Sequence, residues 1–469
     1  MSGFASRDFT PPEGHVPYAV NPALRNAPSY PFQRLAHARA FANAAPGGLI
    51  DLGVGEPQEQ TPAFIRQALI DGVTPQSPYP TAAGRPELRQ AIADWVARRY
   101  GRRLDPDRQI IPTLGAKEAV YSLAQAFTDR EGYSLTFAAD DGGIEGLGWD
   151  SVEFAPRRTV AMPVPAYPVY ELGARMAGAY RQELRLGEPG GWLADLDRIH
   201  NWDELAILWV NSPHNPTGAV APLDWLQQAA DRCRRHGVIL AVDEAYSELW
   251  FEGEAPPGAL QLPDLTGVLV INTLSKRSSM PGIRSGFVAG DPALIELMQR
   301  WRPSVGTAPQ AFVQAAATAA WRDEAHVDEA RERYRTKLTA LQPGLDALGL
   351  EHAGGPGSFF RWLRLPERRR WLDPECAPAP EVAHLAWQLR GRFGGAEPVD
   401  PQRAWPSQPA RRPRPAEHAA ALLAAHGIVV APGSFFGDDY GAYVRVALVP
   451  TVARCHEAAE RMAQVACDA

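Results

Sequence analysis

Three short, continuous apolar runs separated by helical patterns constrain the fold of this chain more than any other feature. The runs span 205–210 (LAILWV), 238–242 (VILAV) and 268–271 (VLVI). Strands that are apolar on both sides are typical of a parallel sheet covered by helices on both faces. Residues 85–100 have apolar side chains near a 3.6-residue period, and a glycine precedes a second predicted helix at 116–127. We therefore expect an α/β domain with a mostly parallel sheet.

A second, smaller lobe is expected after this sheet. The pattern changes to two long helices, at 310–321 and 325–348, and then to short strands. This change indicates an α+β domain, which the helical segment near the N-terminus would join. We expect a large domain over 48–305 and a small domain built from 1–47 and 306–469.

Two segments interrupt this organisation. Residues 133–157 are acidic and rich in glycine, and residues 366–415 contain an RRR run, scattered tryptophans and a proline-rich end. Both are interpreted as insertions that form surface loops, lids or partly disordered segments. We expect disorder for 397–415.

Composition excludes several classes of protein. With 47 basic and 54 acidic residues the net charge is -7, whereas nucleic-acid-binding proteins are more often basic. No run approaches the ~18 apolar residues of a membrane span, and the N-terminus does not resemble a secretory signal. The four cysteines lack CxxC pairing and zinc-site spacing, so no metal site is expected and a reduced cytoplasm fits.

The positive charge is almost entirely arginine. Only three of the 47 basic residues are lysines, namely Lys117, Lys276 and Lys337. Genomic base composition explains this bias, since alanine, proline and glycine are also abundant. The bias has a useful consequence: if the chemistry requires a lysine, only three candidates exist.

Two polar strings follow predicted strands, where ligands bind in parallel α/β sheets. Asn211–Gly218 (NSPHNPTG) follows the run 205–210 and could equally be a simple turn. Asp243–Tyr246 (DEAY) follows VILAV. A carboxylate at the end of a buried strand needs a partner, which could be an arginine or the cationic ring nitrogen of a cofactor.

A third string, Thr273–Phe287 (TLSKRSSMPGIRSGF), follows the run VLVI and contains Lys276. A lysine is normally solvated. At the carboxyl end of a buried strand, however, desolvation and neighbouring cations lower the pKa of the amine, as Schiff-base chemistry requires.

Two further features could bind anions. Gly115, Ala116 and Lys117 open a predicted helix, whose free amides could hold a phosphate, although many helices begin with glycine. Arg445 lies within the apolar segment 443–450 (YVRVALVP). Its partner could be a structural carboxylate or the carboxylate of a substrate.

Taken together, NPTG, DEAY, SK followed by GIRSGF, and the final RVAL resemble, in this order, the motifs of class I/II aminotransferases of the pyridoxal-phosphate fold-type I superfamily. The resemblance covers residues 30–132, 158–365 and 416–460. It implies a mostly parallel, seven-stranded-type sheet with helices on both faces and a smaller α+β domain. It also implies pyridoxal 5′-phosphate as cofactor and ping-pong transfer of an amino group between an amino acid and a 2-oxo acid.

The resemblance assigns the catalytic chemistry to a few residues. It implies that Lys276 forms the Schiff base with the cofactor and later moves the proton at the substrate Cα. It further implies that Asp243 keeps the pyridine nitrogen protonated, and that Tyr246 and Asn215 hydrogen-bond the phenolic oxygen of the ring.

The remaining cofactor contacts follow from the same resemblance. Tyr167 matches the aromatic residue that stacks on the ring. Tyr79 matches the tyrosine that reaches the phosphate of a neighbouring subunit, which implies a homodimer. The phosphate is expected among Gly115, Ala116, Lys117, Thr273, Ser275 and Arg284.

For the substrate, Gly55 matches a glycine of the loop over the substrate, and Arg445 matches the clamp on the α-carboxylate. The other two lysines are expected to play smaller parts. Lys117 is expected to contribute its backbone amide, and Lys337, inside a long polar helix, is expected to be solvated.

The substrate is suggested by longer strings. YPFQRL, LGVGEPQEQTPAFI, LSKRSSMPGIRSGFVAGDP and AAWRDEAHV resemble succinyldiaminopimelate aminotransferases of lysine biosynthesis. That family acts on N-succinyl-LL-2,6-diaminopimelate with 2-oxoglutarate. The two insertions depart from the family and are expected near the position of a substrate lid.

Several alternatives remain open. The chain could be an aspartate or aromatic aminotransferase, or a C–S lyase on the same scaffold. A cofactor-sensing regulator is disfavoured because the N-terminal segment is proline-rich and has no basic recognition helix. A nicotinamide dehydrogenase is disfavoured because GGIEGLG at 142–148 does not join a strand to a helix.

Overall fold

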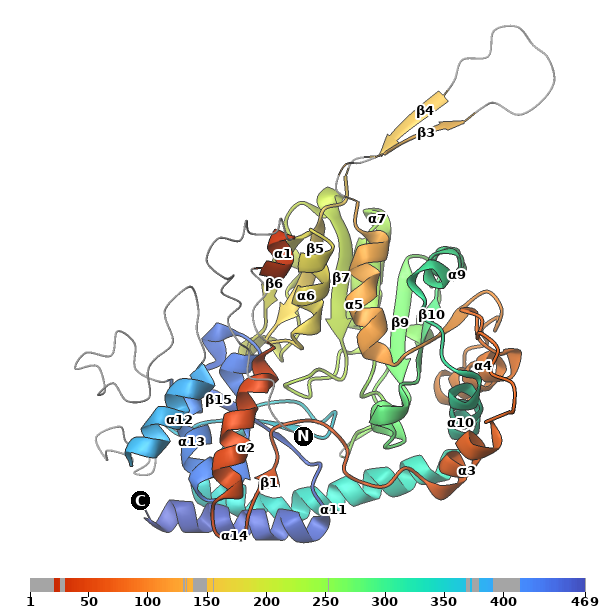
Figure 1. Cartoon of the computed structure of the whole chain (residues 1–469). Helices are drawn as coiled ribbons and strands as arrows, with labels where there is room; N and C mark the ends of the chain where they lie inside the picture. The colour runs from red at the N-terminus through yellow and green to blue at the C-terminus, as the bar shows by residue number, and fades with distance from the viewer. Residues whose placement is uncertain are drawn as a thin grey trace, which may run out of the picture.

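The computed structural model of the chain contains a seven-stranded sheet flanked by helices (Figure 1). The order is β2 (Ile110–Thr113), β10 (Gly286–Gly290), β9 (Val268–Thr273), β8 (Ile239–Asp243), β7 (Leu205–Asn211), β5 (Thr159–Val164) and β6 (Tyr180–Arg185). Only β10 runs antiparallel to its neighbours. The residues described are 21–25, 30–129, 131, 133–137, 150–154, 156–251, 253–367, 372, 379–390 and 414–468.

Alternating side chains of the central strands enter two separate cores, because successive residues of a strand point to opposite faces. Leu208 and Leu240 belong to one core, whereas Trp209 and Ala241 belong to the other. Helices α4 (Pro86–Tyr100), α7 (Leu223–Arg235) and α10 (Ala311–Arg322) cover the first face. Helices α5 (Ala116–Phe127), α6 (Val169–Met176) and α9 (Pro292–Val305) cover the second. The prediction of an α/β sheet with helices on both faces is confirmed.

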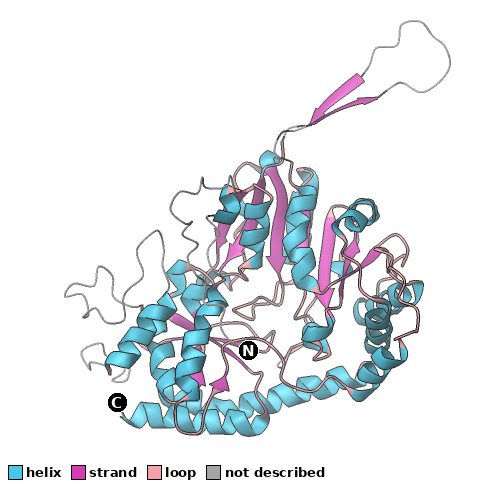
Figure 2. Cartoon of the chain, in the orientation of Figure 1, coloured by secondary structure: helices cyan, strands magenta, loops and turns pink. Residues whose placement is uncertain are grey.

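The small lobe has its own core beside an antiparallel sheet (Figure 2). The sheet order is β11 (Glu351–His352), β12 (Phe360–Arg364), β15 (Tyr443–Ala447) and β14 (Ala431–Pro432). The helices around this core are α2 (Leu35–Asn43), α11 (Ala325–Leu348), α12 (Pro380–Arg390), α13 (Pro415–Ala425) and α14 (Val452–Asp468). A short parallel pair, β1 (Ile50–Asp51) and β13 (Ile428–Val429), joins the start of the large domain to this lobe.

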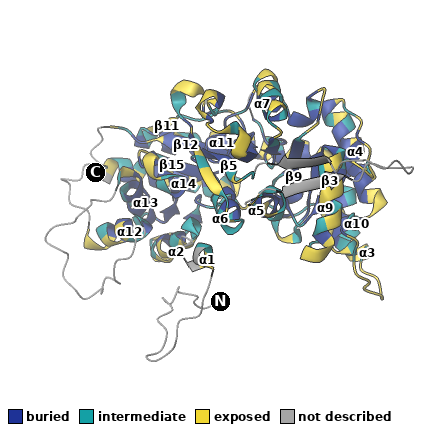
Figure 3. Cartoon of the chain, turned by 90° about the horizontal axis from the view of Figure 1, so that it is seen from above, coloured by how far each residue is buried: buried dark blue, intermediate teal, exposed yellow. Residues whose placement is uncertain are grey.

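The connection between the lobes runs through two consecutive helices. Helix α10 packs against α4 and α3 (Ala63–Asp71), so it contributes to the core of the large sheet although it lies beyond residue 305. Helix α11 follows after only Asp323 and Glu324 and packs along α14 in the small lobe. These two residues, which we call the α10–α11 joint, therefore lie between the two cores. Seen from above, buried residues line the strands and exposed residues lie on the outer sides of the helices (Figure 3).

The segment 133–157 contains an antiparallel hairpin, β3 (Tyr133–Phe137) and β4 (Asp150–Phe154), which projects from the large domain (Figure 1). The hairpin lies between the end of α5 and the start of β5, at the amino ends of the parallel strands. Ligands of such sheets bind at the opposite, carboxyl ends. The hairpin therefore does not occupy the lid position expected from the sequence.

The segment 366–415 contains more structure than expected. Its helix α12 packs against α13 and α2, and it buries Val382, Leu385 and Leu389 in the small-lobe core. The three- and four-residue spacing of these side chains is helical, but the surrounding prolines and arginines obscured it in the sequence. Of the stretch expected to be disordered, residues 397–413 lie outside the described residues.

Among the described helices, none is both long enough and apolar enough to cross a membrane.

Candidate active site

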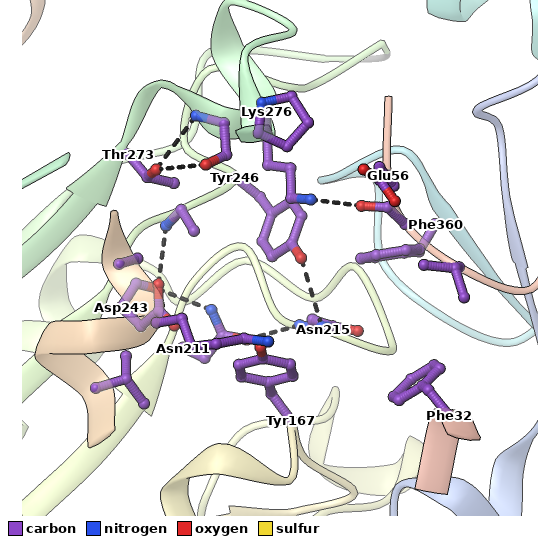
Figure 4. A pocket seen from close by; sticks show the side chains of 18 of the residues that line it. Phe32, Glu56, Tyr167, Asn211, Asn215, Asp243, Tyr246, Thr273, Lys276 and Phe360 are labelled. Carbon is purple, nitrogen blue, oxygen red and sulfur yellow. Dashed lines mark hydrogen bonds between the residues drawn. The ribbon is translucent and has the colours of Figure 1, made fainter. Parts of the chain in front are cut away.

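A cavity of about 450 Å³ opens at the carboxyl ends of the large sheet's parallel strands, where the small lobe meets them (Figure 4). Asn215 comes from the loop after β7, Asp243 from the end of β8 and Lys276 from the short helix after β9, and β15 of the small lobe supplies Arg445. Of the residues predicted from the sequence, the cavity is lined by Gly55, Ala116, Lys117, Tyr167, Asn215, Asp243, Tyr246, Thr273, Ser275, Lys276, Arg284 and Arg445.

Lys276 lies in the short helix α8 (Leu274–Arg277), directly after β9, and its amine points into the cavity (Figure 4). The Nζ donates a hydrogen bond to the carbonyl oxygen of Gly55. Burial lowers the pKa of the Lys276 amine to about 8; Glu56 opposes this shift, and Arg445, Arg284 and Lys117 add to it. The amine therefore loses its proton more readily than a solvated lysine.

Asp243 ends the buried strand β8 with its side chain almost fully enclosed. Its Oδ2 accepts a hydrogen bond from the Tyr170 hydroxyl at 2.7 Å, and its Oδ1 accepts one from the backbone amide of Ala245 at 3.0 Å. Burial raises the pKa of the carboxyl group, and these two hydrogen bonds oppose that shift. Among the described residues no cation is paired with Asp243, which leaves it available to a cationic ligand group in the cavity.

Arg445 is held by two hydrogen bonds within the cavity wall. Its Nη1 donates to Asn215 Oδ1 and its Nη2 to the carbonyl oxygen of Gly53, each at 2.8 Å. The guanidinium also lies over the rings of Phe360, Phe436 and Phe32, at 4.0, 4.7 and 5.2 Å from their centroids. Burial lowers the pKa of Arg445 to about 10, so the side chain remains charged at neutral pH.

Asn215 connects this arginine to Tyr246. Its Nδ2 lies 3.5 Å from the Tyr246 hydroxyl, and its backbone amide donates to Asn211 Oδ1 at 2.7 Å. Burial raises the pKa of the Tyr246 phenol, so the hydroxyl stays protonated and can donate a hydrogen bond. The Tyr246 hydroxyl and the Asn215 side-chain amide both face the centre of the cavity (Figure 4).

The N-terminus of α5 lies at one end of the cavity, and free amides at a helix N-terminus favour anions. Gly115, the residue before this helix, has φ +79°, and a Cβ there would lie 2.6 Å from Arg284 Nη2. Arg284 itself is anchored by the carbonyl oxygens of Pro281 and Leu114, at 2.7 and 3.1 Å. The Thr273 hydroxyl accepts a hydrogen bond from the Ser275 amide, which caps α8. A guanidinium, hydroxyls and helix amides therefore converge, as a phosphate group requires.

These residues fit pyridoxal 5′-phosphate. The α5 terminus, Ser275 and Arg284 suit its phosphate, and the buried Asp243 carboxylate suits its protonated ring nitrogen. Lys276 provides a reactive amine in the same cavity. The observation on which this fit depends is the unpaired, enclosed Asp243 on the cavity wall.

Two predicted site residues do not line the cavity. Gly115 lies behind it and shapes the turn into α5, and Tyr79, in the loop before α4, is fully exposed.

One expectation is wrong: Lys337 is not solvated. Its side chain has no exposed surface, and its Nζ lies 2.7 Å from Glu59 Oε1. The helix is polar in sequence, but its inner face packs against the loop that contains Glu59.

Several cavity residues were not predicted individually. Tyr30 and Phe32 come from the segment before α2, and Glu56 and Phe360 come from the loop after β1 and from β12. Tyr170, which does not line the cavity but donates to Asp243 from the first turn of α6, was also missed, although it stands in the same PAYPVY string as Tyr167. The described residues contain no cluster of three or more histidine, cysteine, aspartate or glutamate side chains suited to a metal ion.

Comparison with known proteins agrees with this geometry. Residues 48–462 match the model of the family "Aminotransferase class I and II". The chain is 31% identical to the 4-dedimethylamino-4-oxo-anhydrotetracycline transaminase OxyQ of Streptomyces rimosus, over 94% of this chain and all of that protein. It is 29% identical to the LL-diaminopimelate aminotransferase of Aquifex aeolicus (strain VF5), over 94% of this chain and 97% of that protein.

A solved structure shows the same fold. The probable N-succinyldiaminopimelate aminotransferase from Thermus thermophilus superposes with a TM-score of 0.71 and 25% identity, covering 93% of this chain and all of that chain. The predictions of a fold-type I architecture, of an aminotransferase and of pyridoxal 5′-phosphate as its cofactor are confirmed. The chain therefore belongs to the class I and II aminotransferases and is a pyridoxal-phosphate-dependent enzyme of that family.

Proposed function

We propose that this enzyme transfers an amino group between N-succinyl-LL-2,6-diaminopimelate and 2-oxoglutarate, as part of lysine and diaminopimelate biosynthesis. The proposal is supported by the strings LSKRSSMPG and AAWRDEAHV, and by the likeness to diaminopimelate-related aminotransferases. The observation that carries the chemistry is the convergence of Lys276, Asp243 and Arg445 on one cavity.

Pyridoxal 5′-phosphate, when bound, supplies an aldehyde that takes up the amino group and a ring that withdraws electrons from the substrate Cα. In our proposal Asp243 holds a proton on the ring nitrogen, and Tyr170 and the Ala245 amide keep the carboxylate oriented. The Tyr246 hydroxyl and the Asn215 amide hydrogen-bond the phenolic oxygen. Tyr167 would stack on the ring face, and the phosphate would be held by Ala116, Lys117, Thr273, Ser275 and Arg284, with Gly115 shaping the turn before them.

Lys276 is the proposed covalent partner of the cofactor and the base that moves the proton at the substrate Cα. A primary amine with a pKa of about 8 is partly unprotonated near neutral pH, so it can both react with an aldehyde and accept a proton. A guanidinium could do neither, because it stays protonated.

Arg445 is the proposed clamp on the substrate α-carboxylate. Its guanidinium is already oriented by Asn215 and Gly53, so binding loses little further side-chain entropy. Gly55 lets the loop approach closely, since a Cβ there would lie 2.5 Å from the Phe360 ring.

We also propose a homodimer in which Tyr79 reaches the phosphate of the partner subunit. The full exposure of Tyr79 supports this proposal, as do Ile70 and Val73 nearby, each 61% exposed. We propose domains of 48–305 for the large one and 1–47 with 306–469 for the small one, although α10, within the last range, packs on the core of the large sheet.

The substrate is tested by assaying the purified enzyme with glutamate and the succinylated keto acid, beside oxaloacetate and aromatic 2-oxo acids. We expect the succinylated acid to give the highest kcat/KM. Absence of turnover with it, together with good turnover of an aspartate or aromatic pair, would contradict the proposed substrate.

A further inference from the structure

A second cavity lies on the other side of the segment that carries Lys276. Its volume is about 380 Å³, and its lining includes Arg277, Ser278 and Ser279, which directly follow Lys276 in the chain. The opposite wall is formed by the loop before α3, by the first residues of α3 (Ala63 and Phe64) and by the first turns of α11. The backbone of 276–279 therefore separates the active-site cavity from this second one.

A chain of hydrogen bonds crosses the second cavity's wall. Asp323 Oδ1 lies 2.5 Å from His326 Nδ1, and His326 Nε2 lies 2.9 Å from Ser278 Oγ. Ser278 is 1% exposed and His326 is 8% exposed. The backbone amide of His326 also donates to Asp323 Oδ1, at 3.0 Å, which fixes the carboxylate at the start of α11.

The direction of these hydrogen bonds follows from the chemistry of the groups. An ionised carboxylate only accepts, so His326 Nδ1 carries the proton that it donates to Asp323. In a neutral imidazole the other nitrogen is then an acceptor, and the Ser278 hydroxyl donates to Nε2. The edge of the Phe64 ring packs against the imidazole, with centroids 5.5 Å apart, and limits its rotation.

The hydrogen-bonded chain joins two parts of the fold that matter for catalysis. Ser278 is the second residue after Lys276, whereas Asp323 belongs to the α10–α11 joint between the two cores. Arg277 strengthens the connection: its guanidinium donates to the carbonyl oxygens of Ala320 and Asp323 and to Glu324 Oε1, at 2.8, 3.1 and 2.6 Å.

The relay residues come from two of the sequence strings named above. LSKRSSMPG supplies Lys276 and Ser278, and AAWRDEAHV supplies Asp323 and His326. Nothing in the amino-group transfer itself uses the second string. Its polar residues instead contact the segment that follows the catalytic lysine.

We propose that Asp323, His326 and Ser278 form a positioning relay that fixes the backbone after Lys276 to the α10–α11 joint. None of the three is a catalytic residue, because the relay acts through Lys276. A misplaced amine reacts more slowly even when substrate binding is intact, since proton transfer depends on the geometry of the reacting atoms.

The test compares four variants of the full-length holoenzyme at a temperature where circular dichroism shows each to be folded. Ser278→Ala removes the donor, and His326→Phe keeps a ring without nitrogen. His326→Gln keeps an acceptor near the position of Nε2. Thr318→Ala is the matched control, because within the described part of the chain the Thr318 hydroxyl donates to the Gln314 carbonyl oxygen in its own helix and contacts none of the relay residues.

We expect Ser278→Ala and His326→Phe to lower kcat about five- to tenfold, as the loss of one oriented hydrogen bond predicts, with KM for the amino donor changed less than about twofold. The midpoint pH of the visible absorbance of the bound cofactor should shift by about half a unit or more, because the surroundings of the Lys276 amine change. His326→Gln keeps an acceptor for Ser278 but loses the bond from Nδ1 to Asp323, so its kcat should fall between those of His326→Phe and the wild type, and Thr318→Ala should stay within about twofold of the wild type.

Three results would overturn the relay. The first is Ser278→Ala with kcat and absorbance midpoint equal to those of the wild type. The second is His326→Gln impaired as strongly as His326→Phe. The third is covalent labelling of Ser278 in the native enzyme by a fluorophosphonate, which would identify it as a nucleophile instead.

The relay rests on the proposed role of Lys276, but the two can fail separately. A Lys276→Ala protein that still binds the cofactor covalently would defeat the role of the lysine. Unchanged behaviour of Ser278→Ala, beside a Lys276→Ala protein that has lost the covalent bond, would defeat the relay alone.

Discussion

Lys337 Nζ lies 2.7 Å from Glu59 Oε1, and no part of the lysine side chain reaches solvent. The amine also donates to the carbonyl oxygen of Val449 at 3.3 Å and lies over the Tyr334 ring. Glu59 follows Gly55 and Glu56 by a few residues in the loop that borders the active site. The pair therefore holds that loop against α11.

Breaking the ion pair between Lys337 and Glu59 should lower the free energy of unfolding. Lys337→Met leaves the Glu59 carboxylate, 21% exposed, with Arg333 at 3.7 Å as its remaining described ion-pair partner, and we expect a loss of about 1–3 kcal/mol of unfolding free energy. Guanidinium denaturation followed by circular dichroism measures it. Arg300→Gln, which removes the exposed partner of Glu296 on α9, is the control and should change stability by less than about 0.5 kcal/mol. Equal effects of the two substitutions would contradict a buried role for Lys337.

Replacing Lys276 should abolish the covalent attachment of the cofactor. We expect Lys276→Ala and Lys276→Arg proteins to lose both the visible absorbance band and the cofactor trapped by borohydride. The arginine variant keeps the positive charge and separates charge from nucleophilicity, because a guanidinium does not form a Schiff base. Peptide mapping of the reduced wild-type protein should find the cofactor on Lys276; finding it on Lys117 would refute the assignment.

The pH dependence of cofactor uptake follows from the Lys276 amine. Its pKa is lowered to about 8, so the unprotonated, reactive form is minor below pH 8 and predominates above it. The rate at which cofactor-free protein develops the visible band should rise with pH and level off by about pH 9. Stopped-flow absorbance measures the rate. A rise that continues to about pH 10.5, as for a solvated lysine, would show that burial does not shift this amine.

Asp243→Asn should remove the charge at the ring nitrogen while keeping the side-chain volume. We expect kcat to fall about 10²- to 10³-fold, the size of effect seen when an oriented electrostatic contact is lost in an enclosed site. Tyr170→Phe, which removes only the hydrogen bond to Asp243, should cost about three- to tenfold. Steady-state kinetics give both values. A fall for Tyr170→Phe as large as that for Asp243→Asn would mean that the two act as one unit.

Arg445→Lys should raise KM far more than it lowers kcat. The ammonium keeps the charge but loses the two-pronged contact with a carboxylate, and it cannot reach both Asn215 and Gly53. We expect KM for the amino acid to rise about 10- to 100-fold. Titration of the absorbance change with amino acid checks affinity directly; unchanged affinity would place the substrate carboxylate elsewhere.

Much of the fold could be predicted because its signals are local. The runs at 205–210 and 268–271 correspond to β7 and β9, and the predicted helices at 116–127 and 325–348 have the bounds of α5 and α11. Apolar periodicity and glycine act over a few residues, so they can be recognised in a single sequence. Lys276 and Asp243 were found in the same way, because strand ends in a parallel sheet meet at one edge.

The features that the sequence did not predict, or predicted wrongly, depend on contacts between segments that are distant in the chain. Lys337 is buried because the loop containing Glu59 covers it, and nothing near Lys337 in the sequence indicates that loop. Tyr30 and Phe32 reach the cavity only because the small lobe packs against the sheet. Helix α12 was hidden because stretches rich in proline and arginine flank it, so its short helical period did not stand out.

The scarcity of lysine has a practical consequence for handling the protein. Lys337 is fully enclosed, Lys276 is partly buried in the active site, and Lys117 is exposed at the edge of the same cavity. Apart from the N-terminal amine, an amine-selective reagent therefore meets its lysine targets only around the cofactor. Succinimidyl coupling to beads or dyes would inactivate this enzyme by modifying its active site, and conjugation through the exposed Cys467 is the safer route.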